Sequence, residues 1–267
     1  MGVLPGRFGD ARRRNDAHRN HDRRKPQARL RRRAGLAAGL ILAAASAIAE
    51  PIRIATYNTE LSQSGPGLLL RDIRRETDEV SKVVETIVSN APDILVLQST
   101  DYDAQGTAAR ALSDLIASDG LDLLYAFMPQ TNTGIPTGID IDGDGRINAP
   151  RDAQGYGRYP GQASIAILSR YPIAKDDALN FTDVLWKDAA PDTDLTLLIP
   201  EEAIGLQRLA SVSLAAIPID HPDGRIWILT HHATPPVFDG PEDRNGYRNA
   251  DENRFWLDQL EKGFVDE

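Results

Sequence analysis

Polar side chains follow three short apolar segments of this sequence. Asn58, the group Gln98–Asp101 and the pair His231-His232 each come directly after such a segment. In layered α/β folds, the ends of strands are where binding and catalytic sites are usually built. An amide such as that of Asn58 can hydrogen-bond a phosphate or a metal-bound water. The alternative is that Asn58 only satisfies the turn after its strand.

A second group of residues that could bind a ligand consists of acidic side chains. Asp140, Asp142 and Asp144, followed by a Gly, spell D-x-D-x-D-G, which resembles the first half of a calcium-binding loop. A complete loop of that type needs an acidic residue at its twelfth place, where this chain has Arg151 with Asp152 beside it. No flanking helices are evident. The pattern therefore leaves calcium binding and a solvated acidic turn as alternatives.

The elements that would position Asn58 form a strand–helix–strand unit. Residues 52–58 have the apolar side chains of a short strand, residues 73–88 place apolar side chains at helical spacing, and residues 94–97 are uniformly apolar. A uniformly apolar run is typical of a strand that is buried on both faces. The order of these elements favours a parallel pair of strands with a right-handed crossover.

The rest of the chain continues the α/β pattern without a linker that would divide it. Residues 129–161 have no apolar period, and loops of that length are usually functional or disordered. The further predicted elements are a helix over 105–118, strands over 121–128, 162–169 and 225–230, a mostly apolar segment over 209–219, and a helix over 247–262 with Phe255, Trp256 and Leu260 on its inward side.

The first two strand ends resemble the endonuclease/exonuclease/phosphatase superfamily. Its first strand ends in an Asn and its second in a Glu that holds a divalent metal. Asn58 matches this pattern, and the resemblance implies that it contacts the substrate phosphate and the metal. Ser99 stands where the Glu is expected. The resemblance implies an α/β fold, a four-layer α-β-β-α sandwich. In an active member it also implies a divalent cation, magnesium or manganese, and a phosphate-ester substrate.

Three strings resemble a secreted bacterial subgroup of that superfamily. In the subgroup, a His just before the last string hydrogen-bonds or protonates a phosphate oxygen, and this position maps onto His232. Arg158 and Tyr159 fall where a phosphate-facing pair is expected, Arg158 as a bidentate donor and Tyr159 as a catalytic hydroxyl donor. The alternative for Tyr159 is loop packing. The strings are NTGIPTGIDIDGDGR (132–146), GYGRYPGQASIAILSRYPI (155–173) and TPPVFDGPEDRNGYRNADENRFW (234–256).

The departures from the superfamily pattern weigh against turnover. A Ser hydroxyl is a poor ligand for magnesium, which prefers carboxylate. The motifs G-D-x-N and S-D-H, expected after the closing helix, do not occur before Glu267, so we expect the C-terminal strands to be missing and sheet edges to be exposed. The positions at which the subgroup carries other residues are Val212, Leu214, Ala215, Ala216 and Ala250.

Two functions therefore remain open. The first is hydrolysis of a phosphodiester or phosphomonoester by metal-activated water. The second is that of a catalytically inactive exported relative or a gene fragment, with calcium binding in the loop Asp140–Asp144 as a remaining property.

The first fifty residues have the composition of an export signal. Residues 1–33 are strongly basic, residues 34–49 are an uncharged apolar run, and the run closes on Ala-Ile-Ala. This order predicts a signal peptide with a basic extension over residues 1–49, cleaved before Glu50, and an incomplete catalytic-type domain over 50–267. An apolar run of sixteen residues is short for a stable membrane span, and the alternative is an uncleaved anchor. We expect a periplasmic or extracellular location.

Charge disfavours general binding of nucleic acid. The whole chain carries −9, residues 1–33 hold twelve Lys or Arg and three Asp, and residues 34–49 hold no charge, which leaves −18 for residues 50–267. A surface so acidic repels nucleic-acid phosphates unless a metal or a local basic patch intervenes. The chain has no Cys, which excludes disulfides and thiolate metal sites.

Overall fold

The computed structural model describes residues 51–263. The predicted signal peptide lies outside these residues, as does the last stretch of the chain. Within the described part, no helix is both long and apolar enough to cross a membrane. The described residues belong to one compact unit that begins at Pro51.

The first sheet contains four strands in the order β1-β2-β4-β3. The predicted strand–helix–strand unit is confirmed, because β1 (Ile54–Asn58) pairs in parallel with β2 (Ile94–Thr100) and places Asn58 opposite Gln98. β4 (Ser164–Ser169) runs antiparallel to β2 and to β3 (Tyr125–Phe127). The ends of β1 and β2 therefore lie side by side, as the sequence predicts.

The second sheet contains three antiparallel strands in the order β5-β6-β7. β5 (Leu179–Asn180) pairs with β6 (Leu214–His221), which pairs along its whole length with β7 (Gly224–His231). Residues 129–161 connect β3 to β4, neighbouring strands of the first sheet, through turns and the short 3-10 turn η2 (Pro150–Asp152).

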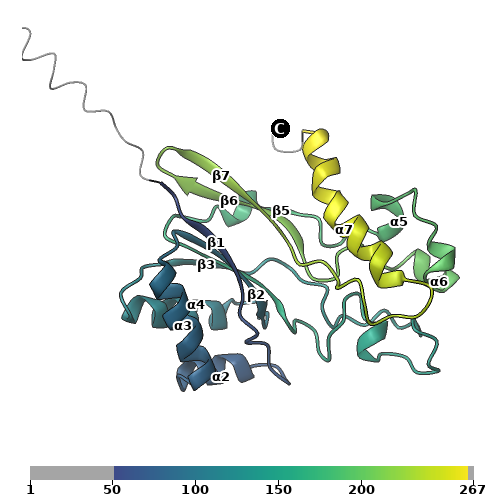
Figure 1. The fold of residues 1–267 in the computed structure, drawn as a ribbon, viewed down its shortest axis with the longest axis horizontal. Helices are drawn as coiled ribbons and strands as arrows, with labels where there is room; N and C mark the ends of the chain where they lie inside the picture. The colour runs from purple at the N-terminus through teal and green to yellow at the C-terminus, as the bar shows by residue number, and fades with distance from the viewer. Residues whose placement is uncertain (1–50, 264–267) are drawn as a thin grey trace, which may run out of the picture. The chain divides into compact units, whose positions relative to one another are not determined.

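Four layers follow from how the side chains alternate along the strands (Figure 1). Leu95 and Leu97 of β2 pack against helices, whereas Ile94 and Val96 point to the second sheet, because successive strand residues face opposite ways. On the other side, β6 gives Ala216 to the cluster that contains Phe255 and Trp256. The predicted α-β-β-α sandwich is confirmed.

The helices occupy the two outer layers. α2 (Leu68–Arg74), α3 (Asp78–Asn90) and α4 (Thr107–Ser118) cover the first sheet, and α7 (Arg244–Glu261) covers the second (Figure 1). The shorter elements are α5 (Trp186–Ala189), α6 (Glu201–Ile204), η3 (Lys175–Asp177) and η4 (Leu195–Leu197).

β1 and β7 are edge strands within the described part of the chain. β1 pairs with β2 alone and leaves Ile54 51% exposed. β7 pairs with β6 alone, and its first half is exposed or half-buried. Unpaired edges of this kind are usually covered in folded proteins, so these two strands are the natural places for further pairing.

Some predicted boundaries were wrong. The helix expected over 73–88 is two helices, which separate at Arg75–Thr77, where Glu76 has φ 48°. The strand expected over 121–128 is reduced to the three residues of β3. In α7, Phe255 and Trp256 are buried as predicted but Leu260 is 53% exposed, because the last turn of the helix extends beyond the second sheet.

Candidate functional site

A cavity of about 510 Å³ lies beside the end of β7. Its lining comes from the β3–β4 connection, from the segment before β6, from the residues after β7 and from the first turns of α7. The lining residues are Thr133, Ile141, Arg151, Ala153, Tyr156, Ala163, Trp186, Gln207, Ser211, Val212, His232, Ala233, Thr234, Pro235, Phe238, Arg244, Asn245 and Arg248.

His232 lines this cavity and has an unused ring nitrogen. Its Nδ1 atom is buried and makes no hydrogen bond with any described residue. Burial lowers the pKa of His232, and the neighbouring His231 lowers it further, so the imidazole is neutral in the free protein. A buried polar atom without a partner is costly in a folded protein. The hydrogen-bonding capacity of this nitrogen is therefore unmet within the described residues.

Two arginines at the start of α7 also line the cavity. They are Arg244, the first residue of the helix, and Arg248, one turn later. Residues four apart share one helix face, so both side chains project to the same side. Burial lowers the pKa of both guanidinium groups, that of Arg248 to about 10. Both remain charged at neutral pH.

Arg248 is part of the wall. Its Nε atom donates to the carbonyl of Leu209 (2.8 Å), its Nη2 atom lies 2.6 Å from the carbonyl of Gln154, and its guanidinium sits 5.8 Å from the ring centroid of Trp186. Nη2 also reaches the carbonyls of Arg208 and Ala210. Backbone from two distant segments is thereby fixed around one buried cation.

Glu252 fixes the opposite side of the wall from the next turn of α7. Its carboxylate accepts the N–H of Ser211 (2.6 Å), the hydroxyl of Ser211 (2.7 Å) and the N–H of Thr234 (2.7 Å). Burial raises the pKa of Glu252, and the charge of Arg248 opposes that shift. The Ser211 hydroxyl also donates to the His232 carbonyl (3.2 Å), which links Glu252 to the backbone beside the imidazole.

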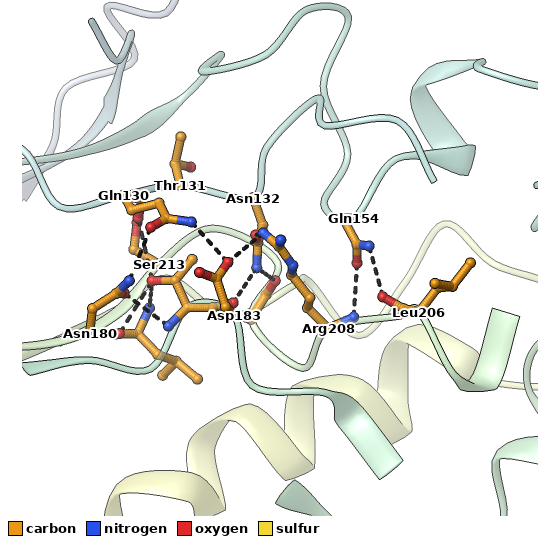
Figure 2. Close-up of polar contacts among 12 residues, drawn as sticks. Gln130, Thr131, Asn132, Gln154, Asn180, Asp183, Leu206, Arg208 and Ser213 are labelled. Carbon is orange, nitrogen blue, oxygen red and sulfur yellow. Dashed lines mark hydrogen bonds and ion pairs between the residues drawn. The ribbon is translucent and has the colours of Figure 1, made fainter. Parts of the chain in front are cut away.

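A polar network, which we call the loop clamp, holds the β3–β4 connection in place (Figure 2). Its centre is Asn132, which is fully buried and donates to the carbonyls of Thr182 (2.7 Å) and Ala210 (2.8 Å). Arg208 donates to the Asn132 oxygen (2.7 Å) and pairs with Asp183 (2.6 Å). The clamp consists of Gln130, Asn132, Gln154, Asp183 and Arg208.

The clamp brings the connection into backbone contact with the cavity floor. Gln154 accepts the N–H of Arg208 (2.8 Å) and donates to the carbonyl of Leu206 (2.8 Å), as Figure 2 shows. At Gly155, a Cβ atom would lie 1.6 Å from the carbonyl oxygen of Ser211, so only glycine fits there. The thirty-residue connection is therefore a positioned part of the site rather than a free loop.

Asn58 and Ser99 do not line the His232 cavity. Asn58 is exposed, and its side-chain oxygen accepts the N–H of Glu60 (3.4 Å), which is the turn-satisfying role. Ser99 occupies a bulge in β2 with φ 55°. The nearby Asp101 is buried, and its carboxylate accepts the Ser62 hydroxyl at 2.9 Å and further backbone N–H groups.

The ends of β1 and β2 consequently do not fit the divalent metal that the resemblance implies. Among the described residues, three metal-ligating side chains come together only at Asp140, Asp142 and Asp144. At the strand ends, Ser99 stands at the position of the Glu. The adjacent buried carboxylate, that of Asp101, already accepts three hydrogen bonds. Magnesium requires several free oxygen ligands, which this end does not supply.

Arg158 and Tyr159 also lie away from the cavity. Arg158 is exposed. Tyr159 lines a separate hollow of about 230 Å³ with Asp101, and its hydroxyl donates to the carbonyl of Gln63 (3.2 Å). Burial and the Asp101 carboxylate raise the pKa of Tyr159, so the phenol stays protonated. Its contacts correspond to the loop-packing alternative.

The three predicted calcium ligands are grouped in space. One carboxylate oxygen from each of Asp140, Asp142 and Asp144 lies within 4.8 Å of the others. Asp140 also accepts the N–H groups of Gly143 (2.8 Å) and Gly145 (2.8 Å), which folds the turn around it. Arg151 lies 3.9 Å from Asp142. The twelfth place of the pattern thus supplies a positive charge, not a ligand.

Sequence reasoning selected His232 but missed Arg244, Arg248 and Glu252. The structure places Arg244 and Arg248 in the lining of the same cavity as His232 and links Glu252 to the His232 backbone through Ser211, and it leaves Asn58, Ser99 and Tyr159 outside. The spacing of Arg244, Arg248 and Glu252, four residues apart each time, is a signal that a helical reading of the closing string contains.

A family model described as "Endonuclease/Exonuclease/phosphatase family" matches residues 55–263. Two solved structures are similar. An endonuclease/exonuclease/phosphatase from Beutenbergia cavernae is 19% identical, with 74% of this chain and 42% of that chain covered and a TM-score of 0.40. Sphingomyelinase C from Streptomyces griseocarneus is 15% identical, with 79% and 59% covered and a TM-score of 0.37.

This chain thus spans about half the length of these solved proteins. Among curated proteins, no match was found.

Proposed function

The chain belongs to the endonuclease/exonuclease/phosphatase family, and we propose that it binds phosphate esters in the His232 cavity, with the imidazole on a phosphate oxygen. The observation that carries the proposal is the buried, unpartnered Nδ1 atom of His232 beside a cavity of about 510 Å³. The family supplies the substrate class, since it acts on phosphate esters.

Electrostatics support an anion at this position. The described chain is acidic overall, yet the guanidinium groups of Arg151, Arg244 and Arg248 meet in one cavity. They form the local basic patch that a phosphate needs in an acidic protein. A neutral His232 accepts a proton or a hydrogen bond from a phosphate monoanion, and it becomes a donor once protonated.

We propose that hydrolysis by this chain is weak or lost. Family members generally depend on a divalent metal, and Ser99 with the occupied Asp101 offers no ligand set for one at the strand ends. The alternative is an active phosphoesterase that cleaves a phosphodiester or phosphomonoester with metal-activated water. His232 has the same phosphate contact in both cases.

A hydrolysis assay separates the two. Bis(p-nitrophenyl) phosphate is incubated with the exported protein and with magnesium, manganese or calcium, and released p-nitrophenolate is followed by its absorbance. We expect the same rate for wild type and His232→Ala. Turnover that requires His232 would establish the active alternative. If neither turnover nor binding of any phosphate ester depends on His232, the proposed function is wrong.

A cation site in the loop Asp140–Asp144 is a second proposal, favoured by the close grouping of three carboxylates. The oxygen ligands suit calcium. Calorimetric titration should give one calcium per chain in wild type and none in Asp142→Asn. Asp119→Asn, an exposed substitution after α4, serves as the control. Equal uptake by wild type and Asp142→Asn would remove this site.

We also propose that residues 1–49 direct export to the periplasm or beyond and that the phosphate-ester domain occupies residues 50–267. The support is the order of a basic segment, an apolar core and Ala-Ile-Ala. N-terminal sequencing of exported protein should begin at or near Glu50. A mature N-terminus at Met1 would contradict cleavage.

A further inference from the structure

Arg244 is a cation without a bound partner. Its guanidinium is half-buried, lines the cavity, and makes neither a hydrogen bond nor an ion pair with any residue in the part of the chain described. The carboxylates of Glu242, Asp142 and Asp239 attract its charge from a distance. A guanidinium presents five N–H donors in a planar fork that matches phosphate. Its partial burial is costly until those donors are used.

Arg244 differs in this respect from the two other arginines of the cavity. Arg151 pairs with Asp142, and the N–H groups of Arg248 donate to backbone carbonyls of the wall. His232, another lining residue, has a buried Nδ1 atom without a partner among the described residues. The cavity is therefore lined by one unpaired cationic fork and by an imidazole whose hydrogen-bonding capacity is not fully used.

Most of the remaining lining is apolar. Ile141, Trp186 and Val212 are buried side chains of the wall. At the rim stands Phe238, which is 76% exposed and has φ 72°. A bulky residue in the left-handed region is strained, and such strain is kept mainly where a site requires it. Exposure of a phenyl ring adds a further cost that contact with a ligand would remove.

The size of the cavity also exceeds what a lone anion needs. About 510 Å³ falls in the range of pockets that enclose whole small molecules. A phosphate group on Arg244 and His232 would leave the apolar part of that space unfilled. The complementary ligand thus has two parts, an anionic head and an apolar substituent.

We propose that this cavity recognises phosphate esters of apolar alcohols, with the Arg244 guanidinium on the phosphate and Phe238 against the apolar substituent. The proposal rests on the proposed function for the identity of the anion. It adds the residue that anchors the anion and the class of alcohol that the cavity selects.

Binding without turnover tests it. The full exported chain is titrated in a calorimeter with phenylphosphonate, which cannot be hydrolysed, in the presence of EDTA. Inorganic phosphate and benzenesulfonate are the comparison ligands. Phenylphosphonate should bind more tightly than phosphate. Arg244→Gln should weaken phenylphosphonate about tenfold or more, because charge-assisted hydrogen bonds are worth that much. Arg254→Gln, on an exposed turn of the same helix, is the matched control and should bind as wild type.

A second variant covers the case in which Arg244→Gln does not fold. Phe238→Ala removes an exposed side chain, so the fold should tolerate it. It should weaken phenylphosphonate about threefold to tenfold through lost apolar contact and leave inorganic phosphate unchanged. Wild-type affinity in both Arg244→Gln and Phe238→Ala, or no binding of phenylphosphonate to wild type, would overturn the inference.

The outcomes also separate this inference from the proposed function. Equal binding of benzenesulfonate and phenylphosphonate, still lost in Arg244→Gln, would keep the two-part cavity but remove phosphate as its anion. Loss of phenylphosphonate binding in His232→Ala but not in Arg244→Gln would keep the phosphate-ester function and reject Arg244 as the anchor.

Discussion

Asn58 and Asn132 have the same side chain but very different surroundings. Asn58, at the first-sheet end, is exposed and uses its oxygen for a bond to the residue two places on. Asn132, beside the His232 cavity, is fully buried and donates to carbonyls that lie 50 and 78 residues further along the chain. At the first-sheet end, the neighbouring Asp101 also uses distant donors, so the local bond is a property of Asn58 itself. Around the cavity, the polar groups hold distant backbone in place and leave specific atoms of His232 and Arg244 unused.

The difference shows which kind of polar residue marks a site. A polar residue at a strand end is ordinary when its neighbours satisfy it. A polar atom that stays buried without a partner in the protein marks a place where a ligand could bind. Nδ1 of His232 meets this criterion and supports the proposed site. Ser164 Oγ, opposite the end of β2, meets it as well, so the proposal also depends on the size and charge of the His232 cavity.

The largest effect that would sharpen this comparison is expected at Glu252. Glu252→Ala leaves the N–H groups of Ser211 and Thr234 without their buried acceptor, and it removes the negative charge that attracts the buried Arg248 guanidinium. The free energy of unfolding should fall by about 3–5 kcal/mol, which is typical when one member of a buried charged pair is removed. Urea denaturation measures it. Glu261→Ala, at the exposed end of α7, should change it by less than about 0.5 kcal/mol.

If Glu252→Ala were as mild as Glu261→Ala, the cavity wall would not depend on α7, and the contrast between the two regions would disappear.

The next effect concerns the two asparagines themselves. Asn132→Ala removes the donors to Thr182 and Ala210 and the acceptor for Arg208. We expect a loss of about 3 kcal/mol in the free energy of unfolding, because buried carbonyls are left unpaired. Asn58→Ala should change it by about 0.5 kcal/mol or less. A cost at Asn58 equal to that at Asn132 would contradict the assignment of the first-sheet end as a local turn.

The smallest effect is a pH dependence at His232. Because the pKa of His232 is lowered by folding, the unfolded chain binds the proton more strongly. The corresponding stability is complete above the unfolded pKa, near 6.5, and is lost as the pH falls through the lower, folded-state pKa. Wild type should therefore lose more stability than His232→Gln between neutral pH and the onset of acid unfolding.

Urea midpoints measured over that pH range test this expectation. His231→Gln is the neighbouring comparison and should keep most of the wild-type decline, because burial lowers the pKa of His232 more than His231 does. Identical curves for wild type and His232→Gln would mean that the imidazole is solvated, and the cavity would lose its unpartnered nitrogen.

Much of the architecture could be predicted from local patterns. The run 94–97 reads as a buried strand because all its side chains are apolar, and the parallel pairing of β1 with β2 follows from the intervening helices. The break between α2 and α3 could not be predicted in this way, since it depends on the left-handed conformation of Glu76. Leu260 looked inward by periodicity, but the sheet beneath it ends earlier.

The sequence by itself determined the family, the order of the elements and the closeness of the β1 and β2 ends, because these follow from hydrophobic period and from strings of adjacent residues. Only the tertiary structure supports the proposal that the site lies at His232 and not at Asn58. That outcome depends on which polar atoms are paired, and the partners come from far along the chain: Arg208 for Asn132, Ser211 for Glu252, and Gln154 for Arg248. Burial and hydrogen bonding across such separations leave no local pattern in a sequence.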